Sequence, residues 1–231
     1  MIWWHGKSSD DVGVIVEHSP EITIPTRKRD KISIQGRSGD LLMEQDAYEN
    51  YTQTYEIYIS AERPRLTTIS HTIAEWLMVK GYQRLEDSYW LDTFRLATYI
   101  GGTNIENVLN RFGRASIEFD CKPQRYYKSG EIAISVENGQ SLYNLSPFTA
   151  KPLITVNGSG NGAISDGVHT LTLTDCNGIT IDCDILQLFK GTENKNSVGS
   201  GSFLELGAGE TEISWSGGIT GVTIIPRWWT L

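Results

Sequence analysis

The stretch LTLTDCNGITIDCDI, residues 171–185, carries the pattern that decides the fold class. Apolar side chains alternate with polar ones on both sides of Asn177-Gly178, and a period of two is typical of a half-buried strand. Asn-Gly also favours a two-residue hairpin turn, because both residues tolerate positive φ. We therefore predict an antiparallel hairpin, in which Cys176 and Cys183 lie too far apart to form a disulfide. All three cysteines, Cys121 included, are expected to be small buried groups.

The same alternation recurs along the chain and predicts a mainly β protein. The alternating sets are Ile22/Ile24, Ile32/Ile34, Ile57/Ile59 and Ile117/Phe119/Cys121 in the first half, and Ile132/Ile134/Val136, Leu171/Leu173 and Val222/Ile224 in the second. One segment differs, from Pro64 to Lys80, where the apolar residues Leu66, Ile69, Ile73, Trp76 and Leu77 follow helical spacing. This segment predicts one helix, with Pro64 in its first turn and Gly81 after its end.

Composition excludes several classes of protein. The 231 residues are 39% hydrophobic and 21% charged, which is sufficient for a packed core. The formal net charge of -8 argues against binding to the nucleic-acid backbone. No apolar run is long enough to span a membrane, and the first residues do not resemble a signal peptide. We therefore expect synthesis and folding in a cytoplasm.

Charge and glycine content divide the chain into two parts. Residues 1–130 contain 16 Lys and Arg against 18 Asp and Glu, whereas residues 131–231 contain 4 against 10. Gly, Asn, Ser and Thr become frequent in the second part, which is typical of short strands joined by tight turns. We predict two domains, residues 1–135 and residues 136–231, the second of them a β-sandwich.

Catalytic motifs are missing from the sequence. The four histidines are scattered, no metal-ligand spacing occurs, and no phosphate-binding or nucleophile motif is found. The glycine-rich run Gly158–Gly162 is interpreted as a flexible hairpin loop. Asp175, Asp182 and Asp184 permit a hypothesis of paired glycosidase carboxylates, but a polar outer strand face explains them more simply. We predict no enzyme activity, no metal and no cofactor.

Two polar segments are candidates for contacts with a partner protein, and two tryptophan pairs are candidates for contacts with sugar. Arg27-Lys28-Arg29 predicts a solvated turn between strands, or else a loop that faces a partner. The polar stretch Ser38–Asn50 predicts a long connection, and long loops tend to make contacts. Trp3-Trp4 and Trp228-Trp229 could stack on sugar rings, although consecutive residues of a strand point to opposite faces and one of each pair would then be buried.

The order of several short motifs resembles the distal tail (Dit) proteins of siphophages and prophages of Gram-positive bacteria. These motifs, spread over nearly the whole chain, are Trp3–Asp10, Gly13–Val16, Pro25–Arg29, Ile32–Asp40, the helix ending at Trp76-Leu77, Tyr82–Leu85, Phe119–Pro123, Asn144, Pro147, Pro152–Val156, Ile181–Asp184 and Ile225–Trp229. The sequence is similar to the family in the I-x-G-R-x-G pattern at Ile34–Gly39 and in the F-x-C-x-P pattern at Phe119–Pro123.

The resemblance implies a fold and a place in the virion. It implies an N-terminal β-sandwich domain with one helix, akin to tail-tube proteins, and a C-terminal galectin-like β-sandwich. It also implies a hexameric ring around the DNA exit channel at the distal end of the tail tube, assembled in the host cytoplasm. The implied partners are other copies of the chain, the tail-tube protein, a tail-tip protein and, as a further candidate, receptor-binding proteins, with no sequence-specific nucleic acid and no membrane.

The leading hypothesis is thus a structural hub without catalysis. The candidate ring or inter-ring contacts are Arg27, Lys28, Arg29, Asp40, Leu41, Leu42 and Met43. The alternative is a carbohydrate-binding module, in which the C-terminal sandwich recognises host cell-wall sugar and Trp228 or Trp229 stacks on it. An exposed aromatic side chain beside clustered polar groups in a groove of the second domain would favour this alternative.

Overall fold

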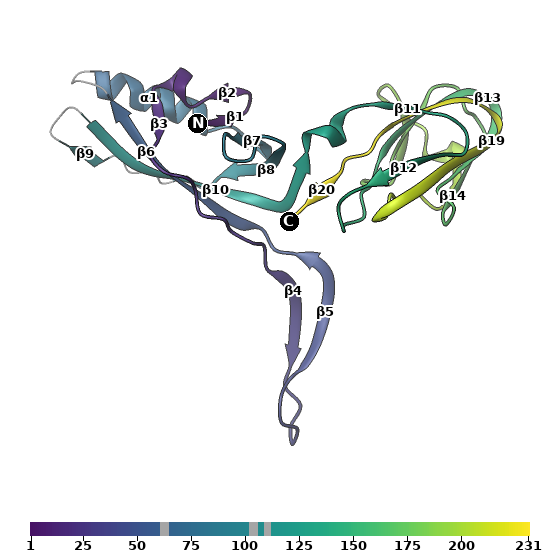
Figure 1. The fold of residues 1–231 in the computed structure, drawn as a ribbon, viewed down its shortest axis with the longest axis horizontal. Helices are drawn as coiled ribbons and strands as arrows, with labels where there is room; N and C mark the ends of the chain where they lie inside the picture. The colour runs from purple at the N-terminus through teal and green to yellow at the C-terminus, as the bar shows by residue number, and fades with distance from the viewer. Residues whose placement is uncertain (61–64, 102–105, 109–111) are drawn as a thin grey trace. The chain divides into compact units, whose positions relative to one another are not determined.

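The computed structural model describes residues 1–60, 65–101, 106–108 and 112–231 (Figure 1). The chain forms two compact units, Met1–Arg125 together with Leu231, and Tyr126–Thr230. Each unit has its own cluster of buried apolar side chains. The described residues are mainly β with a single α-helix, so the predicted fold class is confirmed. The roles predicted for the two domains, 1–135 and 136–231, stay predictions.

The described part of the first unit contains a β-sheet, a helix and a separate two-stranded hairpin. The main path of the sheet runs β2-β1-β7-β8-β10-β6-β3, and β9 pairs with β10. The elements are β1 (Ile2–Trp4), β2 (Lys7–Ser8), η1 (Asp10–Val12), β3 (Val14–Val16), β4 (Arg27–Ile32), β5 (Leu41–Tyr48), β6 (Tyr51–Ser60), α1 (Arg65–Leu77), β7 (Gln83–Asp87), β8 (Thr93–Tyr99), β9 (Glu106–Val108) and β10 (Phe112–Tyr127).

Alternation in β10 and β6 builds the core of this unit. Ile117 pairs with Tyr55 and Cys121 with Tyr51, and all four side chains are buried on the same face. Phe119 lies between them on β10, 4.7 Å from the ring centre of Trp4. Of the first tryptophan pair, Trp4 is therefore a core residue.

Helix α1 covers this core where the sequence predicts a helix. It buries Ile73, Trp76 and Leu77 on one face, as expected from their helical spacing (Figure 1). Its first residue is Arg65, and Gly81 adopts a positive φ of 74° shortly after its end. The predicted first-turn Pro64 lies outside the described residues, as does the side chain of Leu66.

The second unit is a β-sandwich built around two long strands, and all of its residues are described. Its main path runs β11-β19-β13-β15-β16-β17, while β12 pairs with β19 and β14 with β13 and β18. The elements are η2 (Lys128–Glu131), β11 (Ile134–Val136), β12 (Gln140–Asn144), β13 (Leu153–Ser165), β14 (Thr170–Leu173), β15 (Ile179–Asp182), β16 (Gln187–Lys190), β17 (Glu193–Asn194), η3 (Asn196–Val198), β18 (Gly199–Gly201), β19 (Gly209–Ile225) and β20 (Trp229–Thr230).

The predicted hairpin loop at Gly158–Gly162 is wrong, because these residues lie inside β13. Strands β13 and β19 pair along most of their length, with register shifts at this run. The backbones approach so closely that a Cβ on Gly218 would lie 1.7 Å from the carbonyl oxygen of Ser159. The glycines therefore let β13 and β19 bend together. One half of each strand belongs to one layer of the sandwich and the other half to the second layer, and the two layers enclose one core.

The predicted Asn177-Gly178 hairpin is also wrong. β14 and β15 do not pair with each other but with opposite ends of β13. The backbone N–H of Cys176 donates to the carbonyl of Gly160, and its side chain is buried. These contacts tie the connection to the middle of β13, so the chain crosses between layers instead of doubling back. The expected burial of all three free cysteines is confirmed.

Two predicted strand patterns do not form core strands. Ile22 and Ile24 are 71% and 76% exposed and lie outside any strand. Ile32 ends β4 and Ile34 follows it, and both are about two-fifths exposed, at 42% and 41%. Apolar and polar residues thus alternate in the sequence at these positions, but no described apolar layer packs against them.

Candidate assembly interface

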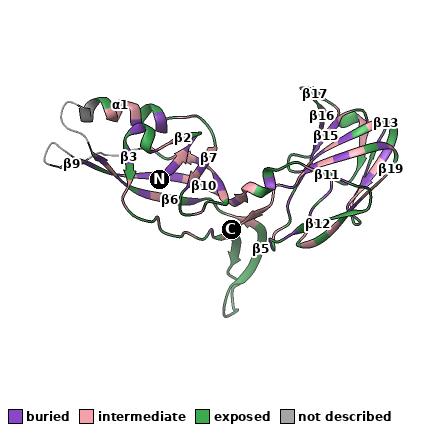
Figure 2. Cartoon of the chain, turned by 45° about the horizontal axis from the view of Figure 1, so that its top comes forward, coloured by how far each residue is buried: buried purple, intermediate pink, exposed green. Residues whose placement is uncertain are grey.

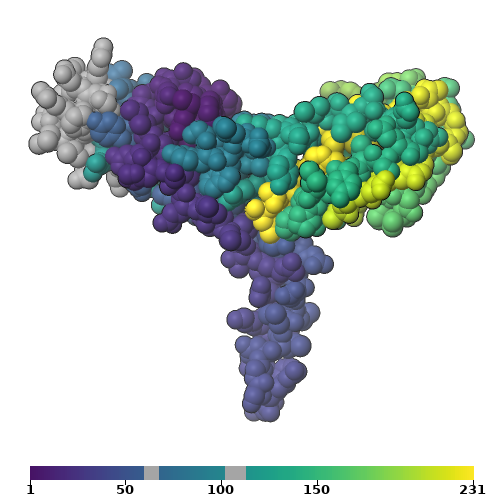
Figure 3. Space-filling model, in the orientation of Figure 1, coloured from purple at the N-terminus to yellow at the C-terminus, as the bar shows by residue number. Residues whose placement is uncertain are grey.

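The hairpin of β4 and β5 is the least buried part of the described chain. It forms a two-stranded sheet of its own that pairs with no other described strand. All of β4 after Arg27 is exposed, as is β5 from Leu41 to Asp46 (Figure 2). On the side visible in Figure 3 no other segment covers the ribbon. An isolated two-stranded ribbon is marginally stable in water, and among the described residues no buried apolar cluster includes this hairpin.

This hairpin corrects two predictions. Arg27-Lys28-Arg29 is part of β4 instead of a turn, and residues Leu41–Tyr48 of the predicted loop Ser38–Asn50 form β5. Neither strand rests on a core, so neither shows a clean alternation of apolar and polar residues. The periodicity that reveals half-buried strands therefore could not detect them.

The register gives the hairpin two chemically different faces. Ile32 pairs with Leu41 and Asp30 with Met43, so these four side chains share one face. Leu42 belongs to the opposite face. The first face, which we call the apolar face, carries exposed Leu41 (40%) and Met43 (53%) beside Ile32. These exposed apolar side chains make the apolar face a candidate interaction site.

The opposite face, which we call the charged face, is organised by Arg27. Its guanidinium donates to the carboxylate of Glu44 at 3.3 Å and to the hydroxyl of Tyr48 at 3.1 Å. Lys31 pairs with Leu42 in the register and Arg29 with Glu44. This face therefore satisfies part of its charge within the hairpin.

The structure brings the predicted contact residues together on this one hairpin. Two segments that are distant in sequence supply them. Arg27, Lys28 and Arg29 come from β4, and Asp40, Leu41, Leu42 and Met43 from the start of β5 and the residue before it. Their role as contacts stays a prediction.

Sequence reasoning missed a buried polar network beneath the sheet. The Arg95 guanidinium donates to the Asp87 carboxylate at 2.7 Å and to the Tyr51 hydroxyl at 2.9 Å. The Tyr55 hydroxyl donates to the same carboxylate oxygen at 2.9 Å, and burial raises the pKa of Tyr55 well above its usual value. The network links β6, β7 and β8 and keeps the sheet in one arrangement. Nothing in the local sequence around Arg95 identifies it as a core residue.

Two of the three aspartates considered for glycoside hydrolysis, Asp182 and Asp175, have structural roles, and the third, Asp184, is exposed. Arg227 holds Asp182 through two hydrogen bonds of 2.7 and 2.9 Å. Burial alone would raise the pKa of Asp182, but these hydrogen bonds lower it, so the carboxyl cannot serve as a general acid near neutral pH. Asp175 accepts a hydrogen bond from the backbone of Asn177 and shapes that turn.

Asp166 forms a second clamp in this unit. Its carboxylate accepts hydrogen bonds from the backbone N–H groups of Val168, His169 and Glu205, and contacts the His169 ring at 2.9 Å. Burial opposes ionisation, but the hydrogen bonds lower the pKa of Asp166 overall. The group fixes the turn between β13 and β14.

The C-terminal tryptophans are partly buried against the core of the second unit. The ring of Trp229 stacks on Phe148 with centres 4.5 Å apart, and its indole N–H donates to the carbonyl of Thr149. Phe148 thus covers one face of the Trp229 ring, and the indole N–H, which is the hydrogen-bond donor of this side chain, already has a partner within the chain. Sugar stacking at Trp228 or Trp229 stays a prediction.

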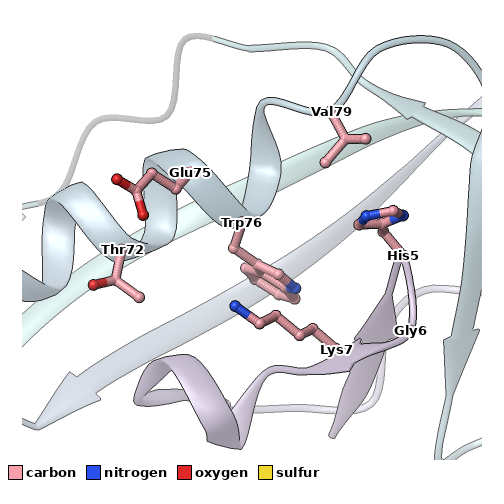
Figure 4. Close-up of a pocket in the computed structure, with 7 residues that line it drawn as sticks. All are labelled: His5, Gly6, Lys7, Thr72, Glu75, Trp76 and Val79. Atoms are coloured by element: carbon pink, nitrogen blue, oxygen red, sulfur yellow. The ribbon is translucent and has the colours of Figure 1, made fainter.

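A shallow groove of about 370 Å³ lies between α1 and the turn after β1 (Figure 4). Trp76 forms its buried wall, and its indole N–H has no hydrogen-bond partner among the described residues. Lys7 and Glu75 lie at the exposed rim. The remaining lining residues are His5, Gly6, Thr72 and Val79.

Two kinds of site were sought among the described residues. No group of three or more His, Cys, Asp or Glu side chains is arranged to hold a metal ion in that part of the chain. Within the same residues, no helix is both long and apolar enough to cross a membrane.

The comparison with solved structures identifies the fold. The chain is similar to the crystal structure of the Dit protein of phage SPP1, described as a paradigm of the hub adsorption apparatus in phages that infect Gram-positive bacteria. The match has a TM-score of 0.79 at 13% sequence identity and covers 100% of this chain and 98% of the other. No protein-family model and no curated protein matches the sequence. The chain therefore has a Dit-like fold over its whole length.

Proposed function

We propose that the protein is a structural hub at the distal end of a phage tail tube, without catalytic activity. The observation that carries this proposal is the full-length match to the SPP1 Dit fold. In this role it forms a hexameric ring around the DNA exit channel, joins the tail-tube protein to a tail-tip protein and supports receptor-binding proteins.

The hairpin supplies one half of the ring contact. A closed ring has heterologous interfaces, so each subunit presents two different complementary surfaces. The apolar face is one such surface, because Leu41 and Met43 are exposed in the single chain and a partner would remove them from water. The complementary surface lies on the sheet of the next subunit.

The outward face of β6 and β10 suits the lining of the channel. Glu56 pairs with Ser116 and Glu118 with Thr54, which places both carboxylates on the face opposite the buried one. Arg114 on the same face is paired with Glu17 at 3.1 Å. An acidic lining repels the phosphate backbone and lets DNA pass without sticking.

Light scattering behind a sizing column tests the ring. The full chain should have six times the chain mass of 25.8 kDa, or a multiple of that value. A mass of one chain at every concentration, with and without the tail-tube protein, would contradict the proposal.

Two lysine substitutions on β5 locate the contact. Met43→Lys introduces a charge on the apolar face and should dissociate the ring. Leu42→Lys tests which face makes the contact, because Leu42 is 43% exposed on the same strand but points to the charged face, so it should dissociate the ring less than Met43→Lys does. Both variants should keep the circular dichroism spectrum of the parent, because neither side chain belongs to a core.

A further inference from the structure

Strand β12 is an open edge of the second unit. It pairs with β19 on one side, and no strand of this fully described unit pairs with its other side. Proteins usually block such an edge with proline, charged residues or a covering segment. The strand sequence QSLYN contains neither proline nor charge. Its free backbone groups are therefore available to an added strand.

The strand is held firmly in place. Leu142 is buried in the core of the unit. The side chain of Asn144, also buried, donates to the carbonyls of Phe148 and Leu206. An incoming segment would thus meet a preformed edge and would not have to order it first.

The outward face of the β12–β19 pair combines an aromatic ring from β12 with two carboxylates from β19. Tyr143 is 66% exposed and pairs with Glu210, while Ser141 pairs with Glu212, so both glutamates share the face of Tyr143. Leu145, directly after the strand, is 90% exposed. Glu210 and Glu212 are both exposed, and neither carboxylate forms an ion pair with a described residue.

We propose that β12 docks an extended, basic segment of another protein as an additional antiparallel or parallel strand. Neighbouring strands are about 4.8 Å apart, so an added strand would lie about 10 Å from β19, within the combined reach of a Lys or Arg and a Glu side chain. Its basic groups would contact Glu210 and Glu212 and pack over the ring of Tyr143. The inference concerns the single chain and does not depend on ring formation.

Binding of model peptides to the full chain tests this site. The probe is a peptide of about ten residues that alternates Lys with Thr, matching the length and period of a strand. A second peptide alternates Glu with Thr, and a third is the Lys peptide with two central prolines. Titration calorimetry at low salt should show binding of the Lys peptide alone. No binding of this peptide at millimolar concentration, or equal binding of either comparison peptide, would overturn the proposal.

Two double variants test where on the protein the Lys peptide binds. Glu210→Gln combined with Glu212→Gln should weaken binding of the Lys peptide about tenfold. The matched control, Glu75→Gln with Asp92→Asn, removes two exposed carboxylates from the first unit and should change it less than about twofold. Equal weakening by both variants would show that net charge alone attracts the peptide.

Amide hydrogen exchange distinguishes an added strand from a surface ion pair. Binding of the Lys peptide should slow exchange in Gln140–Asn144. Binding without slower exchange in this segment would overturn strand addition, whatever the effect of the glutamate variants.

Discussion

Two pairs of long antiparallel strands in this chain have opposite environments. β13 and β19 enclose the core of the second unit, whereas β4 and β5 form a ribbon with both faces in water. The first pair is stabilised by its own chain through burial of residues such as Ile154 and Ile224. The second lacks such a layer among the described residues, and under the proposed function a neighbouring subunit supplies it.

Truncation of one isoleucine in each pair should give the largest difference. Ile164→Ala in β13 should lower the free energy of unfolding by about 3 kcal/mol, because it leaves a cavity in a fully buried site. Ile32→Ala in the hairpin should lower it by less than about 0.5 kcal/mol in the unassembled chain. Denaturant unfolding of both variants measures this. Equal losses would show that the hairpin has an internal core after all.

Added methyl groups should sharpen the same contrast. Gly218→Ala should destabilise by about 3 kcal/mol, because the new Cβ would overlap the carbonyl oxygen of Ser159 and both strands must shift. Gly39→Ala, before β5, meets no atom within 4 Å and costs about 1 kcal/mol through its positive φ of 84°. Thermal unfolding compares the two, and a milder effect at Gly218 would contradict the close approach of β13 and β19.

Acidification should destabilise the second unit through Asp166. The pKa of Asp166 is lowered in the folded state, so its stabilisation is present above the ordinary aspartate value of about 3.9 and is lost as the pH falls through the folded value. Asp166→Asn should cost about 2 kcal/mol at neutral pH and flatten the pH dependence of unfolding below about pH 4. Asp30→Asn, on the exposed hairpin, is the control and should change the free energy of unfolding at neutral pH by less than about 0.5 kcal/mol. A pH profile that Asp166→Asn leaves unchanged would contradict this assignment.

The smallest effect is expected at the Arg27–Glu44 pair. Both side chains are substantially exposed, at 38% and 48%, so Glu44→Gln should change the unfolding free energy of the single chain by less than about 0.5 kcal/mol. Chemical denaturation measures it. A loss above about 1 kcal/mol would show that the charged face is more than a solvated surface.

The alternation of apolar and polar residues correctly predicted the strands that pack on a core, but it gave wrong predictions for segments that do not. Ile117, Phe119 and Cys121 alternate and are buried, as predicted, whereas Ile22 and Ile24 alternate and are exposed. The difference lies in what faces each strand, and this depends on segments that are distant in sequence. For the same reason the helix ending at Leu77 was predictable, because its apolar face is encoded within one segment.

The candidate interface was predictable only in part. Residues Arg27–Arg29 and Asp40–Met43 could be singled out by charge and irregular pattern, but their pairing in one hairpin could not. Asn177-Gly178 has the residues of a tight turn, yet the contacts of Cys176 with β13 overrule that local preference. The open edge at β12 has no sequence pattern of its own, because it is defined by the strand that is missing beside it.

Hydrogen exchange of the hairpin in assembled and dissociated protein tests the central claim most directly. Amides of β13 and β19 should be protected in both states, because their hydrogen bonds and core are internal. Amides of β4 and β5 should exchange rapidly in the dissociated chain and become protected in the ring. Rapid exchange of the hairpin in the ring, or protection already present in the single chain, would contradict the claim that another subunit completes it.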